Sequence, residues 1–166
     1  MERDILHCDM NNFFASVECR LNPELKKYPV AVCGSVEERH GIVLAKNELA
    51  KAQGVKTAET VASAKSKCRG LVIVPPHFEE YLRYSRLARK IYEWYTDRIE
   101  PFGMDECWLD ISGTRRLFGA PEKVADEIRR TVKEELGLTI SVGVSFNKVF
   151  AKLGSDMKKP DAVTVI

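Results

Sequence analysis

The order of strand and helix signals along the chain predicts an α+β fold, in which an antiparallel sheet carries two long helices on one face. When residues 11–76 are left out, the order is strand, helix, strand, strand, helix, strand. This is the split βαβ, ferredoxin-like pattern. Residues 11–76 hold only short elements, which indicates a small α/β module inserted after the first strand. The other face of the sheet is then expected to be open for a functional site.

The first strand and the two long helices carry the clearest signals in this framework. Residues 5–10 form an apolar run that predicts a strand. After a proline pair at 75–76, apolar residues recur every three or four positions over 78–97, which predicts an amphipathic helix. Pro121 begins the second long helix and Gly137 ends it. The remaining elements of this part are predicted as strands at 99–103, 107–111, 139–144 and 163–166 and a helix at 147–157.

The inserted segment begins with a helix and continues with short strands and helices. Asn11 or Asn12 can cap a helix that runs to about Arg20 and ends at Asn22-Pro23. The other elements of the segment are predicted as strands at 30–33, 42–44 and 71–74, a polar turn at 34–40, and helices at 47–53 and 61–68.

Composition indicates a soluble globular protein of one domain, or of one and a half. The chain has 166 residues, of which 45% are hydrophobic and 30% charged, values typical of a folded domain with a normal core. Its apolar stretches are far shorter than the roughly 20 residues that span a bilayer, and its first residues lack the layout of a signal peptide. The five cysteines form no CxxC pair, which favours a reducing compartment. We therefore expect a cytoplasmic monomer that has no contact with a membrane.

Positive charge is concentrated in the inserted segment. Residues 11–76 carry ten Lys and Arg against six Asp and Glu, residues 1–10 carry one against three, and residues 77–166 carry fifteen against fifteen. A basic module next to an acidic segment suits a polyanion held over metal ions. An ordinary solvated surface explains the same distribution equally well.

Three carboxylates stand at the ends of two apolar strands. Asp9 closes the first strand, and Asp105-Glu106 precede the strand at 107–111. Together they could bind Mg²⁺, which prefers a few protein oxygens together with phosphate and water oxygens. Alternation along a strand places Asp105 and Glu106 on opposite faces, so both reach one site only at a turn or bulge, which Gly103 permits. The alternative is a surface hairpin of ordinary acids, with Asp9 capping the next helix.

Three motifs follow one another along the chain at compatible spacing. The first is DMNNFFASVE at 9–18, the second is MDECWLD at 104–110, and the third comprises SVGVSFNKVFAK and SDMKKPD within 141–161. Together they resemble the motifs of the Y-family, translesion DNA polymerases, and residues 41–55 resemble the fingers segment of that family more loosely. The resemblance implies a palm domain at 1–10 and 77–166 with fingers at 11–76.

The resemblance also implies the metal ligands of a polymerase. Asp9, Asp105 and Glu106 would hold two Mg²⁺ ions, and the backbone carbonyl of Met10 would be a further ligand. Asp105 and Glu106 are then the catalytic pair. Two such ions activate an attacking hydroxyl and stabilise a leaving pyrophosphate.

The nucleotide-binding residues follow from the same motifs. Phe14 would be the steric gate whose ring excludes a ribose 2′-hydroxyl, and Phe13 would pack beneath the incoming sugar and base. Lys159 would contact the triphosphate, since an ammonium binds phosphate as a point charge. Lys148 and Lys152 lie near it by this alignment, although on a helix they could equally be solvated.

The fingers segment departs from the family. Family members usually have Thr, Tyr and Arg at the positions of Ala45, Glu48 and Lys51, where they contact the triphosphate. Ala45 removes a hydroxyl, Glu48 adds a negative charge, and Lys51 lacks the bidentate fork of Arg. Lys46 could compensate for these changes. We expect altered nucleotide affinity and an unchanged reaction.

The implied partners are primer-template DNA and deoxynucleoside triphosphates. Family members continue into a thumb and a little-finger domain, which are absent from this chain, and a sliding clamp could be recruited only through that absent C-terminal region. Without these parts the chain is expected to hold DNA weakly, because most phosphate contacts are missing.

Three functions remain open from the sequence. The first is the catalytic core of a translesion DNA-directed DNA polymerase that works in DNA repair. The second, favoured by Ala45 and Glu48, is a catalytically weak DNA-binding or regulatory relative. The third is a nucleotidyl cyclase, which also sets paired acids on a hairpin, and the inserted segment with Phe13 and Phe14 argues against it.

Overall fold

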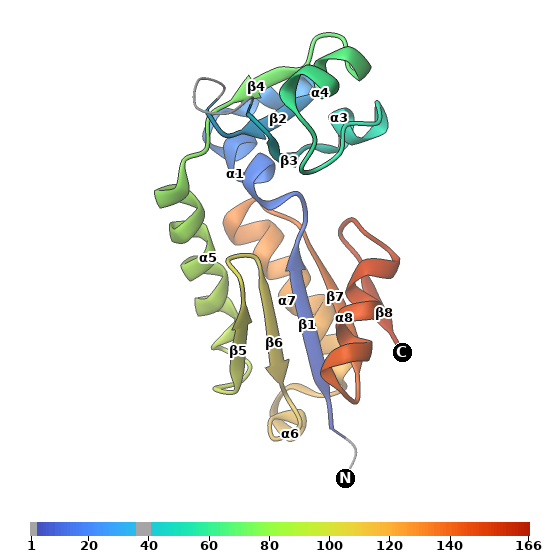
Figure 1. The fold of residues 1–166 in the computed structure, drawn as a ribbon. Coiled ribbons are helices and arrows are strands. Elements are labelled where there is room, and N and C mark those ends of the chain that lie inside the picture. Colours follow the sequence, from blue (N-terminus) through green and yellow to red (C-terminus); the bar gives the residue numbers. More distant parts are fainter. Residues whose placement is uncertain (1–2, 36–40) are drawn as a thin grey trace. The chain divides into compact units, whose positions relative to one another are not determined.

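The computed structural model describes residues 3–35 and 41–166, which form two compact units. Unit 1 comprises Met1–Asn11 and Leu82–Ile166, and unit 2 comprises Asn12–Tyr81. Both units are drawn in Figure 1, where the colours follow the sequence. Residues 36–40 of the predicted polar turn lie outside the described residues.

Unit 1 is built on a five-stranded sheet with the order β5-β6-β1-β7-β8. Strands β5, β6, β1 and β7 pair antiparallel, in the order of a ferredoxin-like core, and β8 pairs parallel with β7. The predicted α+β class is confirmed, with one parallel strand added at the edge. The strands are β1 (Ile5–Met10), β5 (Ile99–Phe102), β6 (Glu106–Asp110), β7 (Ile140–Ser145) and β8 (Val163–Val165).

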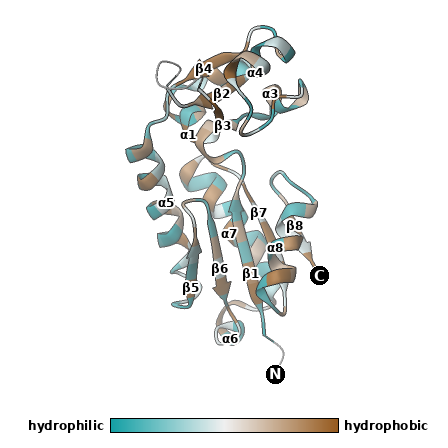
Figure 2. Ribbon diagram, in the orientation of Figure 1, coloured by the Kyte–Doolittle hydropathy of each residue, from teal (hydrophilic) through white to brown (hydrophobic). Residues whose placement is uncertain are grey.

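Two long helices, α5 (Phe78–Tyr92) and α7 (Pro121–Leu136), carry the apolar stripes that the sequence predicts. Hydrophilic and hydrophobic residues alternate along α5 in Figure 2, as expected for a helix that buries one face. In α7 the side chains of Val124, Ile128 and Val132 are buried. Gly137 follows the helix in the left-handed conformation, with φ 67°, and its N–H donates to the Lys133 carbonyl.

The face of the sheet that was expected to be open is partly covered by a third helix, α8 (Lys148–Met157). Figure 1 shows α8 in front of the sheet and α7 behind it. The helix approaches so closely because β7 has Gly143 beneath it. A Cβ built at Gly143 would lie 1.8 Å from the Ala151 carbonyl oxygen, and one built at Gly154 would lie 3.2 Å from the Gly143 Cα. The expectation of an open face was therefore wrong for the part of the sheet around β1 and β7.

Unit 2 is a small α/β unit with a three-stranded sheet of order β3-β2-β4. Strand β2 pairs antiparallel with β3 and parallel with β4. Its core is formed by small and β-branched residues, among them Ala31, Val43 and Ala64. The elements are α1 (Phe13–Leu21), η1 (Pro23–Lys27), β2 (Val30–Cys33), β3 (Val43–Lys46), α3 (Glu48–Ala52), α4 (Val61–Lys67) and β4 (Val72–Val74).

Three elements differ from their predictions. The helix predicted over 78–97 ends at Tyr92, because Trp94 and Tyr95 make tighter bonds to the carbonyls three residues before them. Thr96 then turns away and donates its hydroxyl to the Asp110 carbonyl at 2.7 Å. The sequence analysis also missed the 3₁₀ helix η1 and the one-turn helix α6 (Arg115–Phe118), which are too short to show a periodic pattern.

All five cysteines are buried as free thiols. Among the described residues, no helix combines the length and the apolar character needed to cross a bilayer.

We predict that Gly143→Ala destabilises unit 1 by about 3 kcal/mol. The added methyl group would overlap the backbone of α8 at Ala151 and Ser155, at 1.8 Å and 2.6 Å, so the helix would have to move. Urea unfolding followed by tryptophan fluorescence measures the change. Gly113→Ala is the matched control, because a Cβ there meets no atom within 4 Å, and equal losses in the two variants would contradict the prediction.

Candidate functional site

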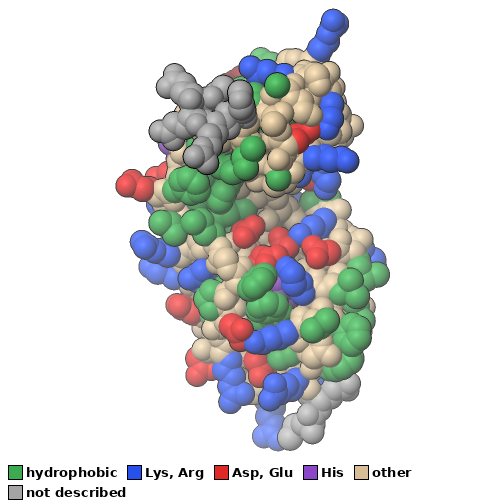
Figure 3. Space-filling view, in the orientation of Figure 1, with side chains coloured by type: hydrophobic (Ala, Val, Ile, Leu, Met, Phe, Trp, Pro, Cys, Tyr) green, Lys and Arg blue, Asp and Glu red, His purple; other side chains and the backbone are tan. Residues whose placement is uncertain are grey.

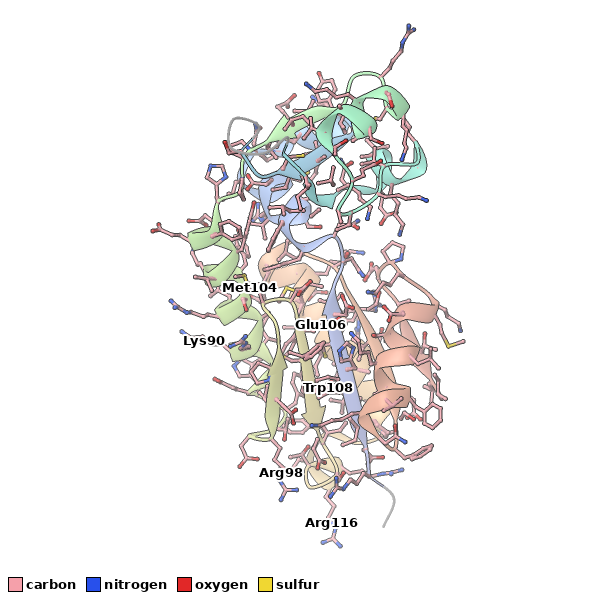
Figure 4. The ribbon with its side chains drawn as sticks, in the orientation of Figure 1. Lys90, Arg98, Met104, Glu106, Trp108 and Arg116 are labelled. Carbon is pink, nitrogen blue, oxygen red and sulfur yellow. The ribbon has the colours of Figure 1, made fainter. Side chains whose placement is uncertain are left out.

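The three predicted carboxylates meet at one end of the sheet of unit 1. Asp9 lies near the end of β1, directly opposite Glu106 at the start of β6, so the two side chains share one face. Asp105 lies in the turn between β5 and β6, where Gly103 has φ 82°. The Asp105 carbonyl accepts a hydrogen bond from the Met10 N–H at 3.0 Å. The turn that the alternation argument required is therefore present, and Figure 4 labels Glu106 and Met104 at this end of the sheet.

Negative charge is crowded at this end of the sheet, and it affects the pKa values of the carboxylates. Burial, with smaller contributions from Glu106 and Asp105, raises the pKa of Asp9 to about 6, although Lys159 opposes the shift. Burial also raises the pKa of Asp105, with a further contribution from Glu106. A cation placed among the three carboxylates would relieve this repulsion.

Two lysines stand against the carboxylates in this structure. The Lys159 Nζ lies 2.6 Å from Asp9 Oδ2 and 2.9 Å from Asp156 Oδ1. The Lys152 Nζ lies 2.6 Å from Glu106 Oε1 and 5.2 Å from the centre of the Phe102 ring. Acidic and basic side chains accordingly interleave on this face of unit 1 in Figure 3. Of the lysines predicted near the triphosphate, Lys152 and Lys159 thus lie at the carboxylates.

Lys148 lies elsewhere on the same face. Its ammonium pairs with Glu100 and lies 5.3 Å from the centre of the Trp108 ring. The Trp108 indole N–H donates to the Lys148 carbonyl at 3.1 Å. Lys148 is therefore held at the side of β5, which leaves Lys152 and Lys159 as the cations nearest the acids.

The segment that carries Lys159 is anchored by Asn11, which the sequence analysis considered only as a helix cap, and by contacts of Asp161 that it did not predict. The Asp161 N–H donates to Asn11 Oδ1 at 2.9 Å, and the Asn11 amide donates to the Ser141 hydroxyl at 2.9 Å. The Asp161 carboxylate pairs with Arg129 and Lys133, both at 2.7 Å. Only the position of Asp161 inside the third motif could have drawn attention to it.

The carboxylate and carbonyl oxygens at this end of the sheet suit a hard divalent cation, although the described residues are not arranged as a complete metal site. Across residues 3–35 and 41–166, no three His, Cys, Asp or Glu side chains form a group that could ligate a metal as they stand. Carboxylate oxygens and the Met10 carbonyl are nevertheless the ligand types that Mg²⁺ prefers. The pairing of Asp9 with Glu106 across β1 and β6, next to the Asp105 turn, favours a cation here.

The aromatic residues predicted for the nucleotide lie at the start of α1 in unit 2. The Phe14 ring stacks on the Tyr81 ring, with centroids 4.2 Å apart and planes 11° apart, and Phe13 is buried beside it. The Tyr81 hydroxyl donates to the buried Glu18 carboxylate, which is also 2.9 Å from the His77 Nδ1. Burial and Glu18 both raise the pKa of the Tyr81 phenol. The sequence analysis placed Tyr81 on a core stripe and did not foresee this support for Phe14.

Two of the residues predicted to depart from the family, Glu48 and Lys51, lie close to each other in unit 2. Glu48 Oε1 accepts a hydrogen bond from the Asn12 amide at 2.7 Å and lies 3.9 Å from the Lys51 Nζ. The Lys46 ammonium donates to the Thr57 hydroxyl at 2.9 Å. The charge of Glu48 is thus partly balanced within unit 2, and its side chain is half exposed, at 50%.

Curated relatives and solved structures resemble the chain over nearly its whole length. DNA polymerase IV of Acetivibrio thermocellus is 66% identical over 166 residues, which are 100% of this chain and 42% of that protein. DNA polymerase IV of Moorella thermoacetica is 44% identical over 98% of this chain and 41% of that protein. The chain therefore spans less than half the length of these relatives.

Solved structures of Y-family polymerases have the same fold. An insertion ternary complex of Dbh DNA polymerase superposes with a TM-score of 0.93 at 30% identity, over 98% of this chain and 48% of that one. DinB from Sulfolobus solfataricus superposes with a TM-score of 0.90, also at 30% identity and over the same shares of the two chains.

The family model described as impB/mucB/samB (IMS) matches residues 8–156. This range contains the first two motifs and most of the third, and the family predicted from them is confirmed. The chain belongs to the impB/mucB/samB family, the Y-family of DNA polymerases.

Proposed function

We propose that this chain is the palm and fingers part of a translesion DNA-directed DNA polymerase. Unit 1 would be the palm, and unit 2 the fingers. The observation that carries the proposal is the register of β1 with β6, which sets Asp9 opposite Glu106 with Asp105 in the adjoining turn. The reaction is transfer of a deoxynucleotide to the 3′-hydroxyl of a primer paired with a template, as part of DNA repair and damage bypass.

The metal site would comprise Asp9, Asp105, Glu106 and the Met10 carbonyl. Two bound Mg²⁺ ions would supply activation of the primer hydroxyl and neutralisation of the charge that develops on the phosphates. The role of the chain is to hold these oxygens at one end of a rigid sheet. Fixed geometry of this kind lowers the entropic cost of bringing the reactants together.

The nucleotide would be bound by residues of the first and third motifs and by Lys51 of the fingers. Phe14, supported by the stacked Tyr81 ring, would exclude a ribose 2′-hydroxyl, and Phe13 would pack beneath the sugar and base. Lys159 would leave Asp9 for the triphosphate once cations replace it at the carboxylate. Lys51 would add a weaker phosphate contact from α3.

The setting of the reaction follows from the same family. The partners would be primer-template DNA and deoxynucleoside triphosphates, and the protein would act in the cytoplasm as a monomer. A sliding clamp would bind through the part of the longer relatives that their match to this chain does not cover.

We predict that Asp105→Asn lowers primer extension by about 10³-fold, because a neutral amide no longer attracts the divalent ions. Single-turnover extension with Mg²⁺, with the protein in excess over primer-template, measures the rate. Asp97→Asn is the matched control, since Asp97 is an exposed residue outside the site. Undiminished extension by Asp105→Asn would contradict the assignment. DNA binding without extension by the unmodified chain would favour a regulatory relative.

A second prediction concerns Glu48. Glu48→Gln keeps an oxygen that can accept from Asn12 but removes the negative charge, so we expect Mg²⁺–dNTP to bind about threefold more tightly at low salt, with the gain lost at high salt. Calorimetric titration at two ionic strengths measures both effects. Glu24→Gln, which changes an exposed charge of η1, should leave the affinity unchanged. Equal affinity in the unmodified protein and in Glu48→Gln would show that the carboxylate does not repel the triphosphate.

A further inference from the structure

His7 is a buried polar residue for which the proposed reaction has no role. It lies on β1 two residues before Asp9, on the same face of the sheet, and its exposed fraction is 0%. Its Nδ1 lies 2.8 Å from the Ser155 hydroxyl of α8. Its Nε2 is one of the few buried side-chain atoms in the described part of the chain without a hydrogen-bond partner.

The hydrogen bonds around Ser155 determine which nitrogen of His7 carries the proton. The Ser155 hydroxyl donates its only proton to the Lys152 carbonyl, at 2.8 Å. It can therefore only accept from His7, so the proton of the neutral ring lies on Nδ1. Nε2 is left as a buried acceptor without a donor, which is unfavourable. An apolar side chain would avoid that cost, so the distinctive contribution of His7 is its one bond to α8.

The hydrogen bond between His7 and Ser155 lies next to the place where α8 packs against the sheet. His7 is directly opposite Gly143 in the register of β1 and β7, and a Cβ built at Gly143 would lie 1.8 Å from the Ala151 carbonyl oxygen of α8. Ser155 is three residues after Lys152 on α8, whereas Lys159 lies beyond the end of the helix at Met157 and is joined to it through Asp156, whose Oδ1 is 2.9 Å from the Lys159 Nζ. Side chains three or four residues apart lie on the same face of a helix, so fixing Ser155 over β1 directs Lys152 toward β6.

We propose that His7 is a positioning residue, whose hydrogen bond to Ser155 fixes the rotation of α8 and thereby holds Lys152 at Glu106 and Lys159 at Asp9. Because these two ammonium groups are the cations nearest the carboxylates, His7 would set the direction from which they meet an incoming triphosphate. This last step rests on the proposed function. The placement of the lysines does not.

Competitive amine acetylation read by mass spectrometry tests the placement on this 166-residue chain without any need for activity. In Ser155→Ala and His7→Leu, we expect Lys152 and Lys159 to react about threefold faster, because they lose their charge-assisted bonds. In His7→Asn, whose amide nitrogen can stand in for Nδ1, labelling should return toward that of the unmodified protein.

The matched control is Ser145→Ala. Ser145 is also a buried serine of unit 1, and its hydroxyl donates to the Ile166 carbonyl at 2.9 Å. Its loss should leave Lys152 and Lys159 protected. The inference is overturned if Ser155→Ala and Ser145→Ala give the same labelling, or if His7→Asn behaves like His7→Leu, since either result would mean that His7 only fills space.

Kinetics separate this inference from the proposed function. For the positioning role, we expect Ser155→Ala to raise the KM for dNTP about tenfold with kcat changed by less than about threefold, and His7→Asn to restore part of the loss. Normal KM values in every variant would overturn the role in nucleotide binding. If the unmodified chain neither binds nor incorporates dNTP, the proposed function fails, while the labelling of Lys152 and Lys159 still decides whether His7 positions α8.

Discussion

Three negative charges gathered at one end of a sheet are the constraint on which the rest of this structure depends. Burial and repulsion raise the pKa values of Asp9 and Asp105, so positive charge beside the group favours its ionised form. Lys152 and Lys159 supply that charge. An ammonium on a flexible stem can leave when a stronger cation arrives. The carboxylates can thus exchange one set of cations for another without refolding of the sheet.

The need for those lysines explains the unusual closeness of α8. Lys152 reaches Glu106 from α8, which lies directly on the sheet, and Lys159 reaches Asp9 from the segment that follows this helix. Gly143 and Gly154 remove the side chains that would keep the two backbones apart. Asn11 and Asp161 then tie the segment after the helix to the end of β1. Glycine contacts and these hydrogen bonds both contribute to placing the lysines.

Much of this arrangement could be predicted from the sequence, because it depends on local patterns. The strands around Asp9 and Glu106 follow from apolar runs, and the turn at Gly103 follows from the need to bring Asp105 to the same site. The position of α8 could not be predicted in this way. Glycine in a strand indicates a close approach, but only the folded sheet reveals which element approaches.

The support of Phe14 was hidden for a similar reason. The three-and-four spacing places Tyr81 on an apolar stripe, which predicts burial but not a stacking partner. Glu18 reads as an ordinary helix acid until its carboxylate is found buried against the Tyr81 hydroxyl. Pairings between elements distant in sequence depend on packing, which periodicity does not encode.

The predicted departure at Glu48 is linked to a second residue, because Glu48 accepts a hydrogen bond from Asn12. Asn12 adopts the left-handed conformation, with φ 48°, which Asn tolerates better than most residues. Its amide donates to Glu48, so the residue before α1 is joined directly to Glu48, the position at which the sequence analysis expects a Tyr in the family. Because the Glu48 carboxylate already accepts a hydrogen bond from Asn12, it need not point toward the phosphates of a bound nucleotide. The substitution at Glu48 is therefore better understood together with Asn12 than as an isolated loss of a nucleotide contact.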